Sequence, residues 1–329
     1  MVGAGTVRVV FCGTPQFAVP TLKHLLAQQD IEIVAVITQP DRPRGRGMQV
    51  SFSPVKETAV ATGVPVHQPE KIRSPESQEM LQGLAPDCVV IIAYGQIIPA
   101  RLLPIPKYGW INLHGSLLPR YRGAAPIHWA IAHGEMRTGL TTMRIDAGMD
   151  TGEMLMRQDV EIGAKETTPE LAARMAEAGA PLMLETLRGI AGGTLVAQPQ
   201  NHSEASYAPL LKKEDGRIDW VRRAPEIYNR MRAFTPWPGA YTTLRGRTCH
   251  IAAEPVSNEM TETRSGESSA PGAAAPGTLR ITHAGLLVSC GGATRLRVLS
   301  VKQEGGKNVD ALEFAHQARL TEEERFGDT

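Results

Sequence analysis

Cysteine is scarce in this sequence, which has only four among its 329 residues. The four are widely separated and none belongs to a Cys-x-x-Cys pair, so neither a zinc site nor a disulfide framework is indicated. Cys12 and Cys88 lie in apolar runs and are expected to be buried in strands. We therefore expect reduced thiols and no metal centre, as is usual in the cytoplasm.

Long hydrophobic runs are also lacking. The longest, Cys88–Ala93, is far shorter than the roughly 20 apolar residues that a helix needs to cross a bilayer. The segment Met1–Val7 does not show the basic and then apolar order of a secretory signal peptide. We expect a cytoplasmic protein without a membrane partner.

An excess of charge of either sign is missing as well. The 35 Lys and Arg residues oppose 34 Asp and Glu residues, which leaves a formal net charge of +1. A nucleic-acid partner would therefore have to meet local basic patches. The first expected strand ends in Gly13-Thr14-Pro15, not in the Gly-x-Gly-x-x-Gly fingerprint of dinucleotide-binding proteins, so a dinucleotide cofactor is not expected.

The sequence does contain a regular alternation of apolar runs and amphipathic stretches, and its length predicts two domains. In residues 1–196 the alternation indicates a mostly parallel sheet with helices on both faces. The expected strands are Val7–Cys12, Ile31–Ile37, Val89–Ala93 and Trp110–His114. We predict a Rossmann-like α/β domain whose ligands bind beyond the carboxyl ends of these strands.

The pattern of apolar and polar residues changes after this domain. Residues 197–214 are polar and loosely patterned and are expected to form a linker. Residues 215–329 predict a small OB-like β-barrel domain built from short strands. Within it, 257–276 is rich in Ser, Ala, Gly, Thr and Pro and is expected to be a disordered insertion. The expected strands are Tyr241–Leu244, Thr248–Ala252, Gly277–Ile281, Gly285–Ser289 and Leu296–Val301.

Two polar residues mark the end of the run Trp110–His114. Asn112 and His114 are two positions apart, so strand alternation places both side chains on one face of the sheet. Farther along, Asp150 lies in a glycine-flanked acidic loop. A carboxylate there can orient an imidazole and stabilise its charge. Because the three groups complement one another, we interpret them as candidate catalytic residues.

The order of these residues resembles a known signature. Asn112-x-His114-x-Ser-Leu-Leu-Pro, followed by Gly-x-Asp150-x-Gly, is similar to the motif of the 10-formyltetrahydrofolate-dependent formyltransferases. The likeness to the methionyl-tRNA formyltransferases of that family extends over nearly the whole chain, apart from 257–276. It implies that a formyl group is passed from 10-formyltetrahydrofolate to the amino acid on initiator methionyl-tRNA.

The candidate residues suit this chemistry. When an amine attacks a formyl carbon, a tetrahedral oxyanion forms and needs preorganised donors. The Asn112 amide and a protonated His114 can supply them, while Asp150 favours the charged imidazole and accepts the proton of the amine, directly or through water. Neither a nucleophilic side chain nor a metal is required. The resemblance further implies a folate pocket, to which we assign Ser116, Leu117, Leu118 and Pro119, with Ile92 and Tyr94 as walls of the pterin ring.

The loop 41–47 carries three arginines among glycine and proline, and such a segment is expected to stay mobile. Arginine forks match phosphates and stack on bases, and the resemblance implies that this loop contacts the acceptor stem of the tRNA. The predicted tRNA contacts are Arg42, Arg44, Arg46, Lys212 and Lys213, with further charge from Arg230 and Arg232. We expect the protein to act as a monomer.

Three alternatives remain open. A folate-dependent formyltransferase that acts on an amino-sugar nucleotide would share the three candidate residues, although it is not expected to keep the arginine loop. A hydrolase would use Ser116, His114 and Asp150 as a nucleophilic triad, but Gly-x-Ser-x-Gly is absent. A non-catalytic RNA-binding module would give no reason for the Asn112 and His114 pair.

Overall fold

The computed structural model describes residues 6–44, 49–256, 274–321 and 324–327. The chain divides into two compact units. The first comprises Met1–Ile127, Arg137–Ile162 and Pro169–Pro209. The second comprises His128–Met136, Gly163–Thr168 and Leu210–Thr329.

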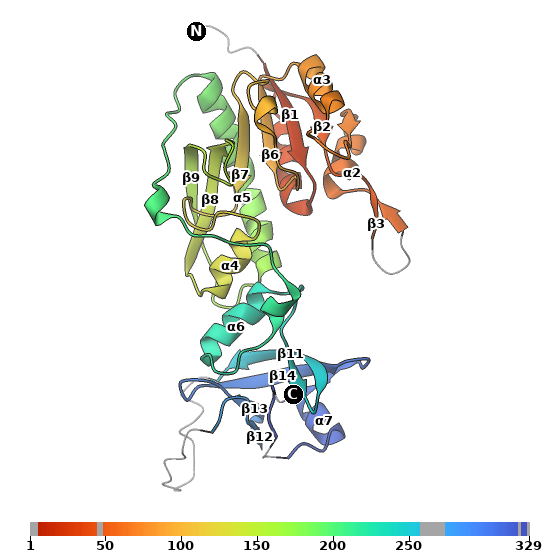
Figure 1. Cartoon of the computed structure of the whole chain (residues 1–329), viewed down its shortest axis with the longest axis vertical. Helices are drawn as coiled ribbons and strands as arrows, with labels where there is room; N and C mark the ends of the chain where they lie inside the picture. Colours follow the sequence, from red (N-terminus) through yellow and green to blue (C-terminus); the bar gives the residue numbers. More distant parts are fainter. Residues whose placement is uncertain (1–5, 45–48, 257–273, 322–323, 328–329) are drawn as a thin grey trace. The chain divides into compact units, whose positions relative to one another are not determined.

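The first unit is built on a seven-stranded sheet with the order β5-β2-β1-β6-β7-β8-β9 (Figure 1). Neighbouring strands from β5 to β7 are parallel, whereas β8 and β9 are antiparallel to their neighbours. The prediction of a mostly parallel α/β sheet is therefore confirmed. The strands are β1 (Val7–Gly13), β2 (Ile31–Ile37), β5 (Val66–His67), β6 (Cys88–Ile92), β7 (Trp110–His114), β8 (Arg137–Arg144) and β9 (Met154–Glu161).

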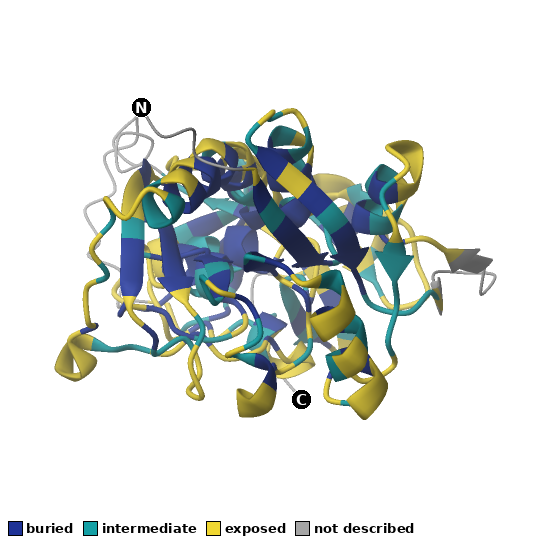
Figure 2. Ribbon diagram, turned by 90° about the horizontal axis from the view of Figure 1, so that it is seen from above, coloured by how far each residue is buried: buried dark blue, intermediate teal, exposed yellow. Residues whose placement is uncertain are grey.

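Helices pack against this sheet, and their starts follow from local chemistry. Ser53 accepts a hydrogen bond from the Lys56 amide at 3.1 Å, and Ser74 caps the next helix in the same way, each just before a proline. Figure 2 shows the strands buried and the helices exposed on one face. The helices of this unit are α1 (Val19–Leu26), α2 (Pro54–Ala61), α3 (Pro75–Leu84) and α5 (Thr168–Ala191), whereas most of α4 (Pro126–Ala132) belongs to the second unit.

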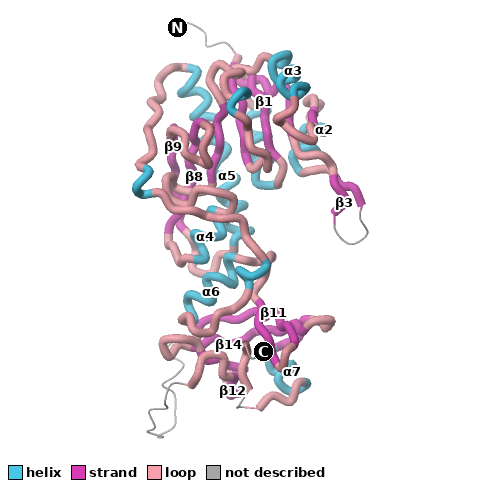
Figure 3. Tube along the Cα trace, viewed as in Figure 1, coloured by secondary structure: helices cyan, strands magenta, loops and turns pink. Residues whose placement is uncertain are grey.

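Residues 197–209 of the segment 197–214, which we expected to be a linker, belong to the first unit, and the second unit begins again at Leu210. Residues 197–209 are irregular apart from one short 3-10 helix, His202–Glu204 (Figure 3). Gln198 pairs with Met154 of β9, and Tyr207 forms a parallel bridge with Arg122. Most of these contacts are made by main-chain atoms, so the pattern of side chains in the sequence does not indicate them.

The arginine loop also has more structure than we expected. Its backbone contains a two-stranded hairpin of β3 (Arg42–Arg44) and β4 (Gln49–Ser51). A ladder needs only main-chain donors and acceptors, so a composition rich in arginine, glycine and proline does not exclude it. Residues 45–48, including Arg46, lie outside the described part of the chain.

The second unit contains an antiparallel sheet in the order β10-β11-β14-β13-β12, with β15 paired to β14. Among the described residues no pairing joins β10 to β12, so closure into an OB-like barrel stays a prediction. Residues 257–273 of the predicted insertion are not among those that the structure describes. The elements are α6 (Ala224–Ala233), β10 (Tyr241–Leu244), β11 (Arg247–Pro255), β12 (Leu279–Thr282), β13 (Gly285–Ser289), β14 (Arg295–Gln303), β15 (Asn308–Asp310) and α7 (Ala311–Gln317).

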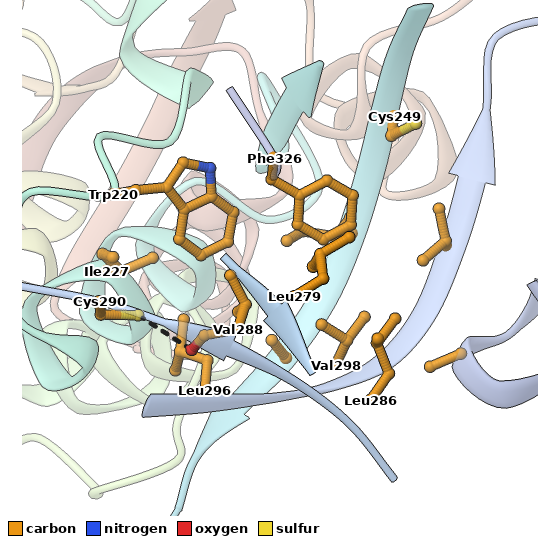
Figure 4. Close-up of a cluster of buried hydrophobic side chains, with 14 of the residues drawn as sticks. Trp220, Ile227, Cys249, Leu279, Leu286, Val288, Cys290, Leu296, Val298 and Phe326 are labelled. Carbon is orange, nitrogen blue, oxygen red and sulfur yellow. Dashed lines mark hydrogen bonds between the residues drawn. The ribbon is translucent and has the colours of Figure 1, made fainter. Parts of the chain in front are cut away.

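A hydrophobic core holds this unit together (Figure 4). The Trp220 and Phe326 rings stack with centroids 5.7 Å apart, and the indole N–H of Trp220 donates to the Thr242 hydroxyl at 3.0 Å. Cys249 and Cys290 are buried in the same core. Full burial with one satisfied polar atom makes Trp220 a structural anchor.

Two short pieces from within residues 1–196 belong to the second unit, a feature the predicted boundary does not include. Trp129 packs edge-on against Phe234 at 5.6 Å, and the Thr168 hydroxyl donates to the Ala233 carbonyl at 2.7 Å. Arg232 donates to two carbonyls of the piece Gly163–Thr168 and is only 7% exposed. These contacts join residues far apart in sequence, which sequence periodicity cannot reveal.

Candidate active site

Strand β7 carries Asn112 and His114 on one face, as alternation predicts. Asn112 is half-buried, and among the described residues its side chain has no hydrogen-bond partner. Leu113, between them, points to the opposite face, where it lies against Gly179 of α5. A carboxamide without a partner beside a histidine is free to bind a ligand.

His114 is 6% exposed, and both of its ring nitrogens face an acceptor. Nε2 lies 2.9 Å from the Tyr121 carbonyl oxygen, and since that oxygen can only accept, Nε2 carries the proton. Nδ1 lies 3.7 Å from Oδ2 of Asp150. That separation is too long for a hydrogen bond but lies within ion-pair distance.

Asp150 lies between β8 and β9 with a left-handed backbone, φ +51°. Its Oδ2 accepts a hydrogen bond from the Gly123 amide at 2.8 Å, and its side chain keeps 21% of its surface exposed. Gly152 is required nearby, because a Cβ there would lie 1.8 Å from the Arg144 carbonyl oxygen. The Gly-x-Asp-x-Gly motif thus has a steric origin.

The loop after β7 is fixed by buried hydrogen bonds. The Ser116 hydroxyl is fully buried and donates to the Arg120 carbonyl at 2.6 Å, while Thr141 donates to the Ser116 carbonyl at 2.7 Å. In the described residues Ser116 has no hydrogen bond to His114, so the geometry does not support a nucleophilic triad. Leu118 and Pro119 are buried and Leu117 is half-buried.

Ile92 and Tyr94, predicted to wall a pterin ring, have their side chains buried at 0% and 1% exposure. The Tyr94 ring lies in the hydrophobic core beside β1 and β6, and burial raises the pKa of its hydroxyl above the ordinary value. Its carbonyl oxygen accepts from the Thr14 hydroxyl at 3.0 Å and the Gln39 amide at 3.1 Å. Tyr94 thus ties three strand-end loops together, and a pocket role for its side chain stays a prediction.

The predicted basic residues fall into three groups. Arg42, Lys212 and Lys213 are exposed, whereas the side chain of Arg44 and all of Arg46 lie outside the described part of the structure. Arg230 and Arg232 are not free surface charges. Burial lowers the pKa of both guanidinium groups, and Arg230 lies over the rings of Trp129 and Phe234.

The base of the arginine hairpin is held by a polar network that the sequence did not indicate. Lys56 forms an ion pair with Asp41 and donates to the Gln68 side chain at 2.7 Å. Gln68 in turn donates to Asp41 at 3.0 Å and to the Gln39 carbonyl at 2.9 Å. The network fixes the point at which the hairpin leaves the sheet.

Two further residues near the site were missed by the sequence analysis, Arg122 and Gln200. Both are buried, and the Gln200 amide donates to the main chain on either side of Thr151 in the Asp150 loop. Across the described residues, no cluster of three or more His, Cys, Asp or Glu side chains is arranged for a metal ion. The described helices include none that is both long and apolar enough to cross a membrane.

The chain matches known proteins over nearly all of its length. Residues 7–187 match the formyl transferase family model and 210–319 match that of the formyl transferase C-terminal domain. The methionyl-tRNA formyltransferase of Solibacter usitatus is 51% identical over 98% of this chain and 99% of its own, and that of Koribacter versatilis is 48% identical over 97% and 98%.

Solved structures show the same fold at much lower identity. An N-formyltransferase from Helicobacter canadensis, in complex with folinic acid and dTDP-3-aminofucose, superposes with a TM-score of 0.62 at 17% identity, covering 92% of this chain and 100% of that one. The two family-model matches are consistent with the polar residues found at the end of β7. So is the similarity to a relative that is 51% identical over nearly the whole chain. The chain is a transferase that belongs to the formyl transferase family and carries both its N-terminal and its C-terminal domain.

Proposed function

We propose that this protein transfers the formyl group of 10-formyltetrahydrofolate to the α-amino group of methionyl-initiator tRNA. The observation that carries the proposal is the unpartnered Asn112 carboxamide on the same strand face as His114, whose Nδ1 lies 3.7 Å from Asp150. The acceptor follows from the names of the relatives at about 50% identity.

The reaction needs one addition and one elimination. The amine nitrogen bonds to the formyl carbon, and the carbonyl oxygen becomes an oxyanion. The amine then loses a proton, the bond between the carbon and N10 of the folate breaks, and N10 gains a proton. No net proton is consumed, so the site has to stabilise charge and move one proton.

Asn112 is suited to the first task. Its amide is not engaged by the described residues, so it can donate to the oxyanion without first breaking a hydrogen bond. His114 is suited to the second donor role through Nδ1, because Nε2 is already bonded to the Tyr121 carbonyl. Asp150 stabilises the protonated ring and accepts the proton of the amine.

The arginine hairpin supports the choice of acceptor. Arg42 is exposed at its base, and the Lys56–Asp41 ion pair fixes where it begins. An exposed guanidinium at this hairpin is suited to phosphates of an acceptor stem. Lys212 and Lys213 are exposed and available for the same purpose.

Transfer is tested by incubating the protein with 10-formyltetrahydrofolate and methionyl-tRNA and measuring formylmethionyl-tRNA. We expect His114→Ala and Asn112→Ala each to lower turnover about 100-fold, the scale for loss of an oxyanion donor. Ser116→Ala should have a far smaller effect, which separates this reaction from a serine hydrolase. Formylation of an amino-sugar nucleotide, with methionyl-tRNA left unchanged, would overturn the choice of acceptor.

A further inference from the structure

Gln200 makes four hydrogen bonds with one carboxamide. Its Nε2 donates to the Asp150 carbonyl at 2.8 Å and to the Gly152 carbonyl at 2.7 Å. Its Oε1 accepts from Nε of Arg122 at 3.0 Å and from the same guanidinium's Nη2 at 2.6 Å. With 5% of its surface exposed, Gln200 is committed to these contacts.

Arg122 anchors the other side of this arrangement. Its side chain is 2% exposed and, within the described residues, lies within ion-pair distance of no carboxylate. Apart from Gln200, the one hydrogen-bond partner of its guanidinium among the described residues is Nδ1 of His202, at 3.1 Å. A buried cation needs acceptors, so the Gln200 oxygen is held firmly in place.

Gln200 and the neighbour of Arg122 in the chain contact different parts of Asp150. Gln200 fixes the main chain of the Asp150 loop, while Gly123, next to Arg122, donates its amide to the Asp150 carboxylate at 2.8 Å. Asp150 itself has a left-handed backbone with φ +51°, which is uncommon for non-glycine residues, although aspartate adopts it more readily than most.

We propose that Gln200, anchored by Arg122, is a positioning residue that sets the Asp150 carboxylate opposite Nδ1 of His114. The inference rests on the proposed formyl transfer. Only a carboxamide offers both the donors for two carbonyls and the acceptor for a guanidinium. The segment 197–209 is therefore part of the site's support and not a spacer between domains.

The sharpest variant is Gln200→Glu, which keeps the shape and the acceptor for Arg122 but removes both donors. Its second oxygen would face the carbonyl oxygens of Asp150 and Gly152 and repel them. We expect single-turnover transfer to fall about 10-fold or more, as misplacement of a reacting group does. The KM for each substrate should stay within about twofold, because neither touches Gln200. Gln198→Glu is the matched control, since that side chain is exposed two residues earlier in the same segment.

A double-mutant cycle separates positioning from general damage. In an Asp150→Asn background, Gln200→Glu should lower the transfer rate by less than about a further twofold, because the carboxylate that Gln200 positions is already absent. An equal loss in both backgrounds, or no loss in the parent, would overturn the inference. If Gln200→Glu does not fold, the double variant Arg122→Met with Gln200→Met is tested in the same two backgrounds. This double variant leaves no unpaired charge buried.

Amide hydrogen exchange gives a readout that does not depend on the reaction. Exchange at Gly123, whose amide is bonded to Asp150, should become faster in Gln200→Glu and stay unchanged in Gln198→Glu. A parent that forms no formylmethionyl-tRNA would refute the proposed function alone. Unchanged Gly123 exchange in Gln200→Glu would refute the positioning role, whatever the parent's activity.

Discussion

Gly179→Ala tests whether packing behind β7 fixes the catalytic strand. A Cβ at position 179 of α5 would lie 2.5 Å from Cδ2 of Leu113, and Leu113 separates Asn112 from His114 on β7. Ordinary carbon contacts are about 3.5–4.0 Å, so the Leu113 side chain, the strand or the helix must move by about 1 Å. The same change in an open helix would gain about 1 kcal/mol from propensity.

The net effect follows from two opposing terms. Overpacking costs about 1–3 kcal/mol, so we expect a net loss of stability of up to about 2 kcal/mol after the helix gain is subtracted. A shift of about 1 Å in catalytic groups can lower turnover up to about 100-fold. Thermal unfolding and single-turnover transfer measure the two effects on the same sample.

Gly83→Ala is the matched control for this prediction. Gly83 lies in α3 of the same unit, and a Cβ there meets nothing within 4 Å. It should raise stability slightly and leave transfer unchanged. If Gly179→Ala were as stable and as active as Gly83→Ala, contact between α5 and Leu113 would not be what places the site.

Two further changes probe ion pairs in the first unit. Lys56→Met removes the partner of Asp41 at the base of the hairpin. We expect a several-fold higher KM for methionyl-tRNA and an unchanged KM for the folate. A higher KM for the folate with an unchanged KM for methionyl-tRNA would contradict the role of the hairpin. Arg188 hydrogen-bonds Asp30 and thereby lowers the pKa of that carboxyl, so its contribution is present above the unfolded pKa and is lost as the pH falls through the folded pKa. Arg188→Leu should therefore lower the melting temperature slightly at pH 7, because the pair is exposed and screened by solvent, and should change it little near pH 2. An equal loss at both pH values would contradict the pairing.

The sequence was sufficient to predict the parallel sheet and to place two of the candidate catalytic residues on one face of a strand. Continuous apolar runs predicted the parallel strands, and a spacing of two placed Asn112 and His114 together. The meeting of His114 with Asp150 could not be derived from spacing, because it depends on how β8 and β9 return the chain to β7. There the resemblance to formyltransferases supplied the pairing.

Other parts of the structure depend on contacts that leave no periodic signal. The segment 197–209 appeared to be a linker because its packing uses main-chain bridges and one buried glutamine. Arg232 appeared to be a surface charge, yet it donates to main-chain carbonyls of a distant segment. A polar residue that hydrogen-bonds a buried main-chain group and one that faces water can be of the same residue type, so the sequence pattern does not distinguish them.

The burial of all four cysteines has a practical consequence. Cys12 and Cys88 lie in the first unit, Cys249 and Cys290 in the second, and burial raises the pKa of each thiol above its ordinary value. A neutral, shielded thiol reacts slowly with alkylating reagents until the surrounding structure opens. The four thiols of the native protein should therefore react slowly with oxidants, and the rate at which each pair becomes labelled would report separately on the opening of the unit that contains it.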